Sequence, residues 1–249
     1  MFAANLTAIR ALFFANIAFL VFAPVGLAWS GVAVSVALYY VFGVFGIVGS
    51  FHRFHSHNSY SFKHRWVEVL WTFLGHLSGS GSAVGWVAIH RMHHRDPDGP
   101  DDPHTPKNGA WRTLTVDYRY GDSAWREVRD MMAKPYCVWM HKYYFLILAG
   151  YVSALFAAFG LPGVYYGFSM ASVLTLAMSG ATNYVSHIPW LGYQSNDAGR
   201  STNVWWSALF NCGEGWHNNH HADPGSYTTK QRWWEFDMTG TAIRMVKNG

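Results

Sequence analysis

The sequence predicts an all-α integral membrane protein of a single domain, residues 1–249, with four transmembrane helices in two hairpins and a helical cap on one side of the membrane. Hydrophobic residues make up 51% of the chain and charged residues only 13%, whereas an ordinary soluble domain has about 25% charged residues. The mean hydropathy is only +0.03. The apolar residues must therefore be concentrated in segments, which identifies the predicted spans.

Four charge-free stretches are each close to the roughly 20 residues that a helix needs to cross a bilayer. They are Ala11–Ala28, Gly31–Phe51, Tyr143–Leu161 and Gly163–Val185, which predict spans at about 6–28, 31–51, 143–161 and 163–185. Short connectors without charge, Trp29–Gly31 and Gly160–Gly163, suit tight turns. Lys and Arg lie mostly outside the spans, so the positive-inside rule predicts a cytoplasmic cap made of residues 52–142 and 186–249.

One further apolar stretch, Val69–Ile89, is long enough to cross but has a middle rich in Gly and Ser. We expect it to form a pair of helices in or near the membrane interface, because irregular backbone at membrane depth must be buried in protein. The two cysteines, Cys137 and Cys212, are expected to be free thiols. A net charge of +4 fits anionic lipid headgroups, and no motif indicates nucleic-acid binding.

Histidine is concentrated at the predicted cytoplasmic ends of the apolar stretches. Three motifs contain nine of the 14 histidines: HRFHSH begins at His52, HRMHH at His90 and GEGWHNNHH at Gly213. Another histidine, His187, ends the motif NYVSH after the fourth span. Since all four motifs fall on one side of the membrane, the topology allows their side chains to meet.

The spacing within the motifs predicts which histidines point the same way. His90, His93 and His94 follow an i, i+3, i+4 pattern that places side chains on one helix face, as do His217, His220 and His221. His52 and His57 are five residues apart, about 140° around an ideal α-helix. We therefore expect these two to face different metal ions rather than one.

So many imidazoles in one place indicate metal binding. Imidazole is a ligand for Zn, Cu, Fe and Ni, and six to nine imidazoles exceed the three or four ligands that zinc needs, so a two-iron centre is the simplest interpretation. Spacing alone gives weak support to His187. Structural roles are expected for the remaining histidines, which are His55, His64, His76, His104 and His141.

The three motifs resemble, in order, spacing and flanking residues, the histidine boxes of the membrane fatty acyl desaturases, especially the branch that contains stearoyl-CoA desaturase and its bacterial and cyanobacterial relatives. The resemblance extends to DDPHTP, KPYCVWMHKYYF, NYVSH and RWWEFDMT, and covers the chain from about Gly46 onward. It implies a metal-binding set made of His52, His57, His90, His93, His94, His187, His217, His220 and His221, with Asn183 bound through water. It leaves open which histidine binds which iron.

The resemblance also implies an activity. The enzyme would use two iron ions, O₂ and two external electrons to introduce a cis double bond into a saturated acyl chain, with Δ9-type position, and without a tightly bound organic cofactor or a separate acid or base residue. Trp86 would line the substrate channel. An Arg–Asp pair that precedes the second box in the acyl-CoA branch is replaced here by Ala88 and Ile89, so CoA, carrier-protein and lipid substrates all remain open.

The chain has no room for a fused cytochrome b5 domain, so the resemblance implies a separate electron donor, a ferredoxin or a cytochrome b5, and a location in a bacterial inner membrane with the active site and termini facing the cytoplasm. Two alternatives stay open. A hydroxylase or acetylenase could use the same scaffold, although Arg53, where related hydroxylases have an acidic residue, favours desaturation. A histidine-rich metal transporter or sensor is the other, but it would need ionisable residues inside the spans.

Overall fold

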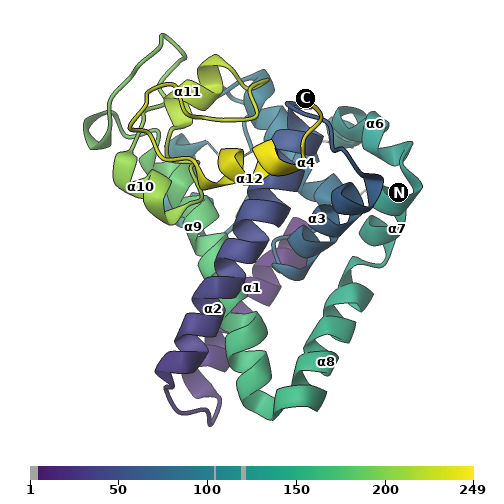
Figure 1. Cartoon of the computed structure of the whole chain (residues 1–249). Coiled ribbons are helices and arrows are strands. Elements are labelled where there is room, and N and C mark those ends of the chain that lie inside the picture. Colours follow the sequence, from purple (N-terminus) through teal and green to yellow (C-terminus); the bar gives the residue numbers. More distant parts are fainter. Residues whose placement is uncertain (1–4, 104, 119–121) are drawn as a thin grey trace.

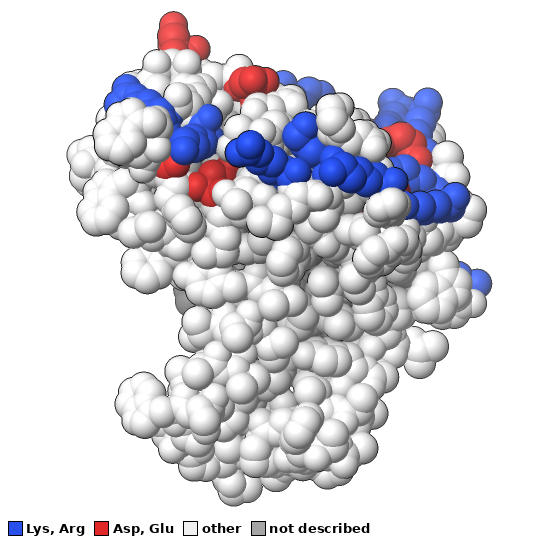
Figure 2. All heavy atoms as spheres, in the orientation of Figure 1, with Lys and Arg blue, Asp and Glu red and all other residues white. Residues whose placement is uncertain are grey.

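A computed structural model describes residues 5–103, 105–118 and 122–249. The described residues form helices and connecting loops, with isolated β-bridges but no named strand. Four long helical segments run side by side, and most of the shorter helices gather at one end of them (Figure 1). The charged side chains visible in Figure 2 lie over that same end, whereas the opposite end shows none on this face.

The first hairpin joins α1, Leu6–Phe22, to α2, Trp29–Val41. We expected the first helix to extend to residue 28 and the turn to lie at Trp29–Gly31, and both expectations were wrong. The helix ends before Pro24, because proline disfavours helical backbone in the residue before it, and Ala23 is extended with φ −65° and ψ 140°. Residues 23–28 form the connector, and α2 already begins at Trp29.

The second helix continues without a break into η1, a π-helix over Phe42–Ser56. Trp29–Ser56 is therefore one apolar helix of 28 residues, long enough to cross a membrane. It extends past residue 51, where we expected the span to end, so His52 and His55 lie within the helix itself. A π-helix has hydrogen bonds between residues five apart, and the bond from the His57 amide to the His52 carbonyl, 3.3 Å, continues that pattern.

Glycine allows η1 to pack very closely against α3, Arg65–Leu77. A Cβ atom added to Gly46 would lie 2.4 Å from the backbone nitrogen of Gly75, and one added to Gly75 would lie 2.5 Å from the ring of Phe51. Small residues at such a crossing let two backbones approach each other. This contact sets the position of the helix that contains His52.

The second hairpin contains α8, Tyr144–Val164, the π-helical η4, Tyr165–Met170, and α9, Ala171–Val185. The whole stretch Tyr144–Val185 is apolar enough to cross a membrane. Its helix is interrupted at Gly160, where φ is 63° and ψ is −153°, and the chain reverses direction between the first part of α8 and α9 (Figure 1). Glycine takes this backbone conformation without a steric penalty, which agrees with the turn expected at Gly160–Gly163.

The stretch Val69–Ile89 does not form one spanning helix. It contributes to two helices, α3 and α4, Ala83–Arg95, which are separated by the glycine- and serine-rich turn. The expected helix pair is therefore confirmed. Ser82 caps α4, with its side chain accepting a hydrogen bond from the Gly85 amide, and α4 presents the second histidine motif at its C-terminal end.

The remaining helices lie mostly at the charged end of the molecule. They are η2 Pro106–Asn108, α5 Ala110–Leu114, η3 Asp122–Val128, α6 Arg129–Met132, α7 Pro135–Lys142, η5 Pro189–Leu191, α10 Trp205–Phe210, α11 His217–Ala222 and α12 Met238–Val246. Cys137 and Cys212 are both buried free thiols, as expected.

Candidate metal centre

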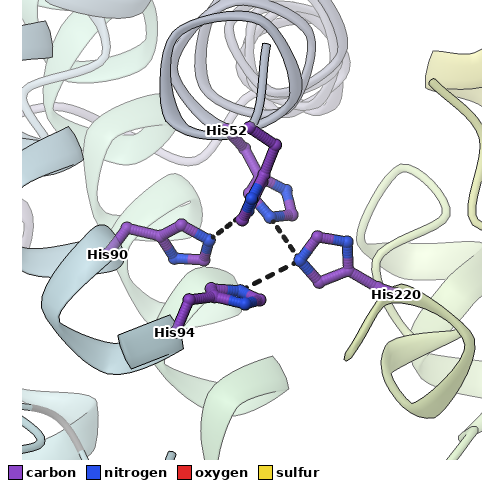
Figure 3. Close-up of side chains that lie close together, drawn as sticks. His52, His90, His94 and His220 are labelled. Carbon is purple, nitrogen blue, oxygen red and sulfur yellow. Dashed lines mark hydrogen bonds between the residues drawn. The ribbon is translucent and has the colours of Figure 1, made fainter. Parts of the chain in front are cut away.

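The structure brings together the nine histidines expected to bind metal, although they come from four separate segments. They fall into two groups, and within each group the candidate ligand atoms lie within 4.8 Å of one another. The five-histidine group contains His52, His57, His90, His94 and His220, and the four-histidine group contains His93, His187, His217 and His221. Figure 3 shows His52, His90, His94 and His220 pointing toward a common centre.

Several short distances between imidazole nitrogens fit ligands of a shared ion. In the five-histidine group, Nε2 of His220 lies 3.0 Å from Nε2 of both His52 and His94. In the four-histidine group, Nε2 of His217 lies 3.2 Å from that of His187 and 3.0 Å from that of His221. Two imidazole nitrogens bonded to one metal at about 2.1 Å and at right angles would be about 3.0 Å apart. The donor sets therefore fit two metal ions.

His52 and His57 belong to the same group, so the expectation that they would face different metals was wrong. The expectation assumed that this segment is an α-helix. In the π-helical geometry that ends at His57, residues five apart lie on the same side of the helix, and the ring centroids of His52 and His57 are 5.0 Å apart.

The two i, i+3, i+4 motifs are divided between the groups. In α4, His90 and His94 belong to the five-histidine group while His93 belongs to the other; in α11, His217 and His221 share the four-histidine group while His220 crosses to the first. On a helix of 3.6 residues per turn, residues i and i+4 lie closer in direction than i+3 and i+4. Each motif therefore bridges both groups, and our expectation that it presents all its imidazoles in one direction was too simple.

Three carboxylates orient histidines from behind. Glu214 lies 2.5 Å from Nδ1 of His52, Asp102 lies 2.7 Å from Nδ1 of His93, and Asp98 lies 2.9 Å from Nδ1 of His187. A hydrogen bond from Nδ1–H to a carboxylate leaves the lone pair on Nε2, which is the arrangement typical of a metal-binding histidine. We did not predict these carboxylates from the sequence, although all three lie within a few residues of a histidine motif.

Six of the nine imidazoles have a lowered pKa, which favours the neutral form that binds metals. Burial and, secondly, the neighbouring His52 lower the pKa of His57 to about 2. Burial and neighbouring imidazoles likewise lower the pKa of His90, His94, His217, His220 and His221. Burial opposes the ionisation of Glu214, but His52 and Arg53 lower its pKa to about 2, so it stays a carboxylate.

The other described histidines lie outside both groups, as expected. His55 is buried, and its Nε2 lies 3.1 Å from the hydroxyl of Thr72. His76 is buried in contact with the Thr72 carbonyl, His141 contacts the hydroxyl of Ser82 at 2.6 Å, and His64 is exposed. His104 lies outside the described residues.

A largely apolar cavity of about 940 Å³, open mouth included, extends past both groups. His52 and His90 of one group and His217 of the other line it, together with Asn183 and Trp86. The Trp86 ring stacks on His90 with centroids 4.9 Å apart. Seven aliphatic residues also line the wall, Leu6, Ile9, Ile47, Val48, Ile89, Val116 and Leu176.

The apolar wall is typical of a site for an apolar ligand. A family model described as fatty acid desaturase matches residues 27–244. The chain belongs to the fatty acid desaturase family. It is therefore an oxidoreductase that acts on acyl lipids, and the resemblance seen in the histidine motifs is confirmed.

Curated relatives support the same family. An sn-2 palmitoyl-lipid 9-desaturase of Nostoc sp. (strain 36) is 31% identical over 90% of this chain and 81% of its own length. An sn-1 stearoyl-lipid 9-desaturase of Anabaena variabilis is 32% identical over 96% of this chain and 90% of its own length. A chloroplastic palmitoyl-monogalactosyldiacylglycerol delta-7 desaturase of Arabidopsis thaliana is 32% identical over 90% of this chain and 62% of its own length.

Proposed function

We propose that this desaturase introduces a cis double bond of Δ9 type into a saturated acyl chain, at a centre of two iron ions, with O₂ as co-substrate. The observation that carries the proposal is the position of both histidine groups on the wall of one apolar cavity. The reaction consumes one acyl –CH₂–CH₂– unit, O₂, two electrons and two protons, and produces –CH=CH– and two molecules of water.

The ligand set follows the two groups. His52, His57, His90, His94 and His220 would hold one iron, and His93, His187, His217 and His221 would hold the other, with Asn183 contributing through a water molecule. Bound iron supplies the reduction of O₂ to an oxidant able to take hydrogen from an unactivated methylene. No separate acid or base residue is assigned, and no tightly bound organic cofactor is expected.

The protein would hold two adjacent methylene groups beside the histidine groups and exclude water from them. The aliphatic part of the wall, with Leu6 and Ile9 from α1 and Leu176 from α9, suits an acyl chain. Trp86, stacked on His90, lies where the chain passes the five-histidine group. The distance from the acyl headgroup to this point would determine the position of the double bond.

An acyl group on an intact lipid is the substrate that we favour over acyl-CoA or an acyl carrier protein. The names of two of the relatives specify acyl-lipid substrates. The positions before the second histidine motif also support this choice, because Ala88 and Ile89 are buried and uncharged and provide no ionic contact for a thioester carrier.

We further propose four membrane spans, with α1 and Trp29–Ser56 in one hairpin and the two halves of Tyr144–Val185 in the other. Large apolar side chains are exposed along these helices, including Phe22 at 82%, Leu146 at 68% and Phe159 at 68%, which suits contact with lipid. The charged end of the molecule (Figure 2) would then face the cytoplasm of a bacterial inner membrane. A separate acidic donor, a ferredoxin or cytochrome b5, would dock there and supply electrons.

Lipid profiling of a desaturase-deficient host tests the activity. We expect a new monounsaturated acyl chain in membrane lipids that appears only in the presence of O₂, with its double-bond position and its lipid class given by mass spectrometry. Hydroxylated or acetylenic chains without the alkene would instead establish one of the alternative activities. A variant with His220→Ala serves as the inactive control.

A further inference from the structure

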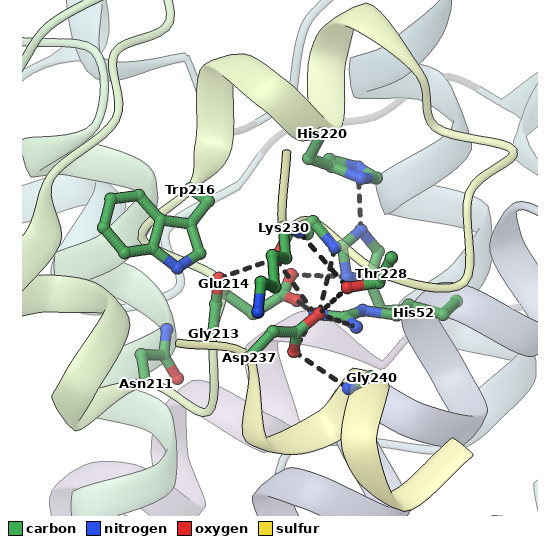
Figure 4. A network of polar contacts seen from close by, with 12 residues as sticks. His52, Asn211, Gly213, Glu214, Trp216, His220, Thr228, Lys230, Asp237 and Gly240 are labelled. Atoms are coloured by element: carbon green, nitrogen blue, oxygen red, sulfur yellow. Dashed lines mark hydrogen bonds and ion pairs between the residues drawn. The ribbon is translucent and has the colours of Figure 1, made fainter. Parts of the chain in front are cut away.

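A buried ionic network behind the five-histidine group extends from His52 to the C-terminal segment of the chain. Arg53, the residue after His52, is 1% exposed. Its Nη2 donates to Glu214 Oε1 at 2.7 Å, and its guanidinium donates to both carboxylate oxygens of Asp237, at 2.8 and 3.1 Å. The other oxygen of Glu214 accepts from Nδ1 of His52. Figure 4 shows Glu214 and Asp237 within this network beside His52.

We propose that Asp237, Arg53 and Glu214 act as a positioning relay that fixes the direction and tautomer of His52, so that the C-terminal segment controls one metal position and not the other. The inference rests on the proposed metal centre. It concerns residues for which neither the family match nor the relatives specify a role.

Glu214 is the connecting residue because both of its carboxylate oxygens face donors. Arg53 can only donate, and His52 must donate from Nδ1 if its Nε2 is to bind metal. A carboxylate satisfies both donors at once. An amide in its place would have to turn its NH₂ group toward one of them, so Glu214→Gln would lose one contact whichever way it is oriented.

Asp237 holds Arg53 in the same way. Besides the two contacts with Arg53, its oxygens accept from the Thr228 hydroxyl, the Thr229 amide and the Gly240 amide, at 2.7, 3.0 and 2.9 Å. The side chain of Asp237 is also the N-cap of α12. The conformation of residues 228–240 therefore determines the position of the Arg53 guanidinium, and through it the position of the Glu214 carboxylate that contacts His52.

The two metal positions differ in this respect. Behind the four-histidine group, Asp98 and Asp102 contact His187 and His93, and both lie in the turn that follows α4. The carboxylate behind His52 is held by Arg53, an arginine of the same helix as His52. Arg53 and Asp237 reach the metal centre through Glu214 and His52, so changes in the relay should affect the five-histidine group.

The test uses the full-length protein produced with ⁵⁷Fe and purified in detergent. For Glu214→Gln we expect a changed Mössbauer signal for one of the two irons, an unchanged signal for the other, and loss of iron to a chelator at least about tenfold faster than in the wild type. Asp237→Asn should affect the same iron more weakly. Glu68→Gln is the matched control and should resemble the wild type. Glu68 lies on α3, and its carboxylate accepts hydrogen bonds from Tyr136 and Lys134.

A second measurement needs no iron. In the metal-free protein with ¹⁵N-labelled histidine, His52 should carry its proton on Nδ1, identified by the signal that disappears in His52→Asn, and Glu214→Gln should change the tautomer or broaden it. If the wild type bound no iron pair, the proposed function would fail. The NMR result on the metal-free protein would still show whether Glu214 fixes the tautomer of His52. Unchanged Mössbauer and NMR signals in Glu214→Gln, or equal disturbance of both irons, would overturn the inference. If Glu214→Gln did not accumulate, Asp237→Asn would be judged by the same two criteria.

Discussion

Replacement of His55 tests whether this histidine has a purely structural role, in contrast to the neighbouring histidines that are expected to bind metal. His55 lies between His52 and His57 in the first motif, yet it belongs to neither group. It is 2% exposed, and its Nε2 lies 3.1 Å from the hydroxyl of Thr72. His55→Ala should therefore destabilise the protein while leaving both metal positions intact.

The expected cost follows from these contacts. Thr72 keeps two other partners, the Ser50 hydroxyl at 2.9 Å and the Glu68 carbonyl at 2.8 Å, so the loss of His55 does not leave it unpaired. The lost hydrogen bond contributes about 1 kcal/mol, and the cavity left by the ring adds about 1–3 kcal/mol. We expect His55→Ala to lower the free energy of unfolding by about 2–4 kcal/mol. His55→Gln should lower it by about half as much, because its amide can still donate to Thr72.

Thermal unfolding in detergent and iron analysis of the purified protein measure the two effects separately. His55→Gln should unfold at a lower temperature but keep the same iron content per chain as the wild type. His57→Ala, two residues further along, should lose iron. Folded His55→Gln protein that had lost iron would refute the assignment of His55 to a structural role.

Three further outcomes are expected. His220→Ala should insert into the membrane but lose turnover by more than about a thousandfold, whereas His141→Ala should stay within about threefold, measured by alkene production in the host. Gly46→Ala should lower the unfolding temperature, because its Cβ would lie 2.4 Å from the Gly75 backbone and overpacking costs about 1–3 kcal/mol. Burial lowers the pKa of His90 and His217, so the unfolded chain binds protons that the metal-free folded protein does not. Its stability, measured by denaturant unfolding, should fall by up to about 2 kcal/mol per such histidine between about pH 6.5 and 5.

Each of these outcomes has a result that contradicts it. Near wild-type turnover in His220→Ala would remove that residue from the ligand set. An unchanged unfolding temperature in Gly46→Ala would mean that η1 and α3 are not in close backbone contact. A metal-free protein that was equally stable at both pH values would show that its imidazoles are not held neutral by burial.

The composition was sufficient to predict the helical class, and the histidine motifs together with their resemblance to those of the desaturases predicted the residues that meet. Long uncharged stretches must be helical if they contact lipid, and the motifs at their ends must converge if the stretches fold into hairpins. The positions of helix ends were harder to predict. Pro24 ends α1 earlier than a count of apolar residues suggests, and that signal was present in the sequence.

The π-helix was the feature that spacing could not reveal. An argument that assumes 3.6 residues per turn separates His52 from His57, whereas a helix with hydrogen bonds between residues five apart brings them together. The close crossing at Gly46 and Gly75 accompanies this geometry and involves a contact between distant parts of the chain. Such a contact depends on tertiary packing, so it is not encoded in the local pattern around His52.

The supporting carboxylates were visible in the sequence but without a stated role. Asp98 and Asp102 follow the second motif closely, and Glu214 comes three residues before His217. Each could have been proposed as a partner for Nδ1 of a histidine. Which carboxylate meets which histidine depends on the fold, because Glu214 orients His52 from the first motif and not a histidine of its own motif.

Metal analysis combined with Mössbauer spectroscopy of the purified wild-type protein tests the central claim most directly. The two histidine groups predict two irons per chain in distinguishable surroundings, one with five imidazoles and one with four. A single tightly bound zinc would contradict the account. So would iron that gave a single Mössbauer signal and stayed bound in the double variant with His93→Ala and His220→Ala.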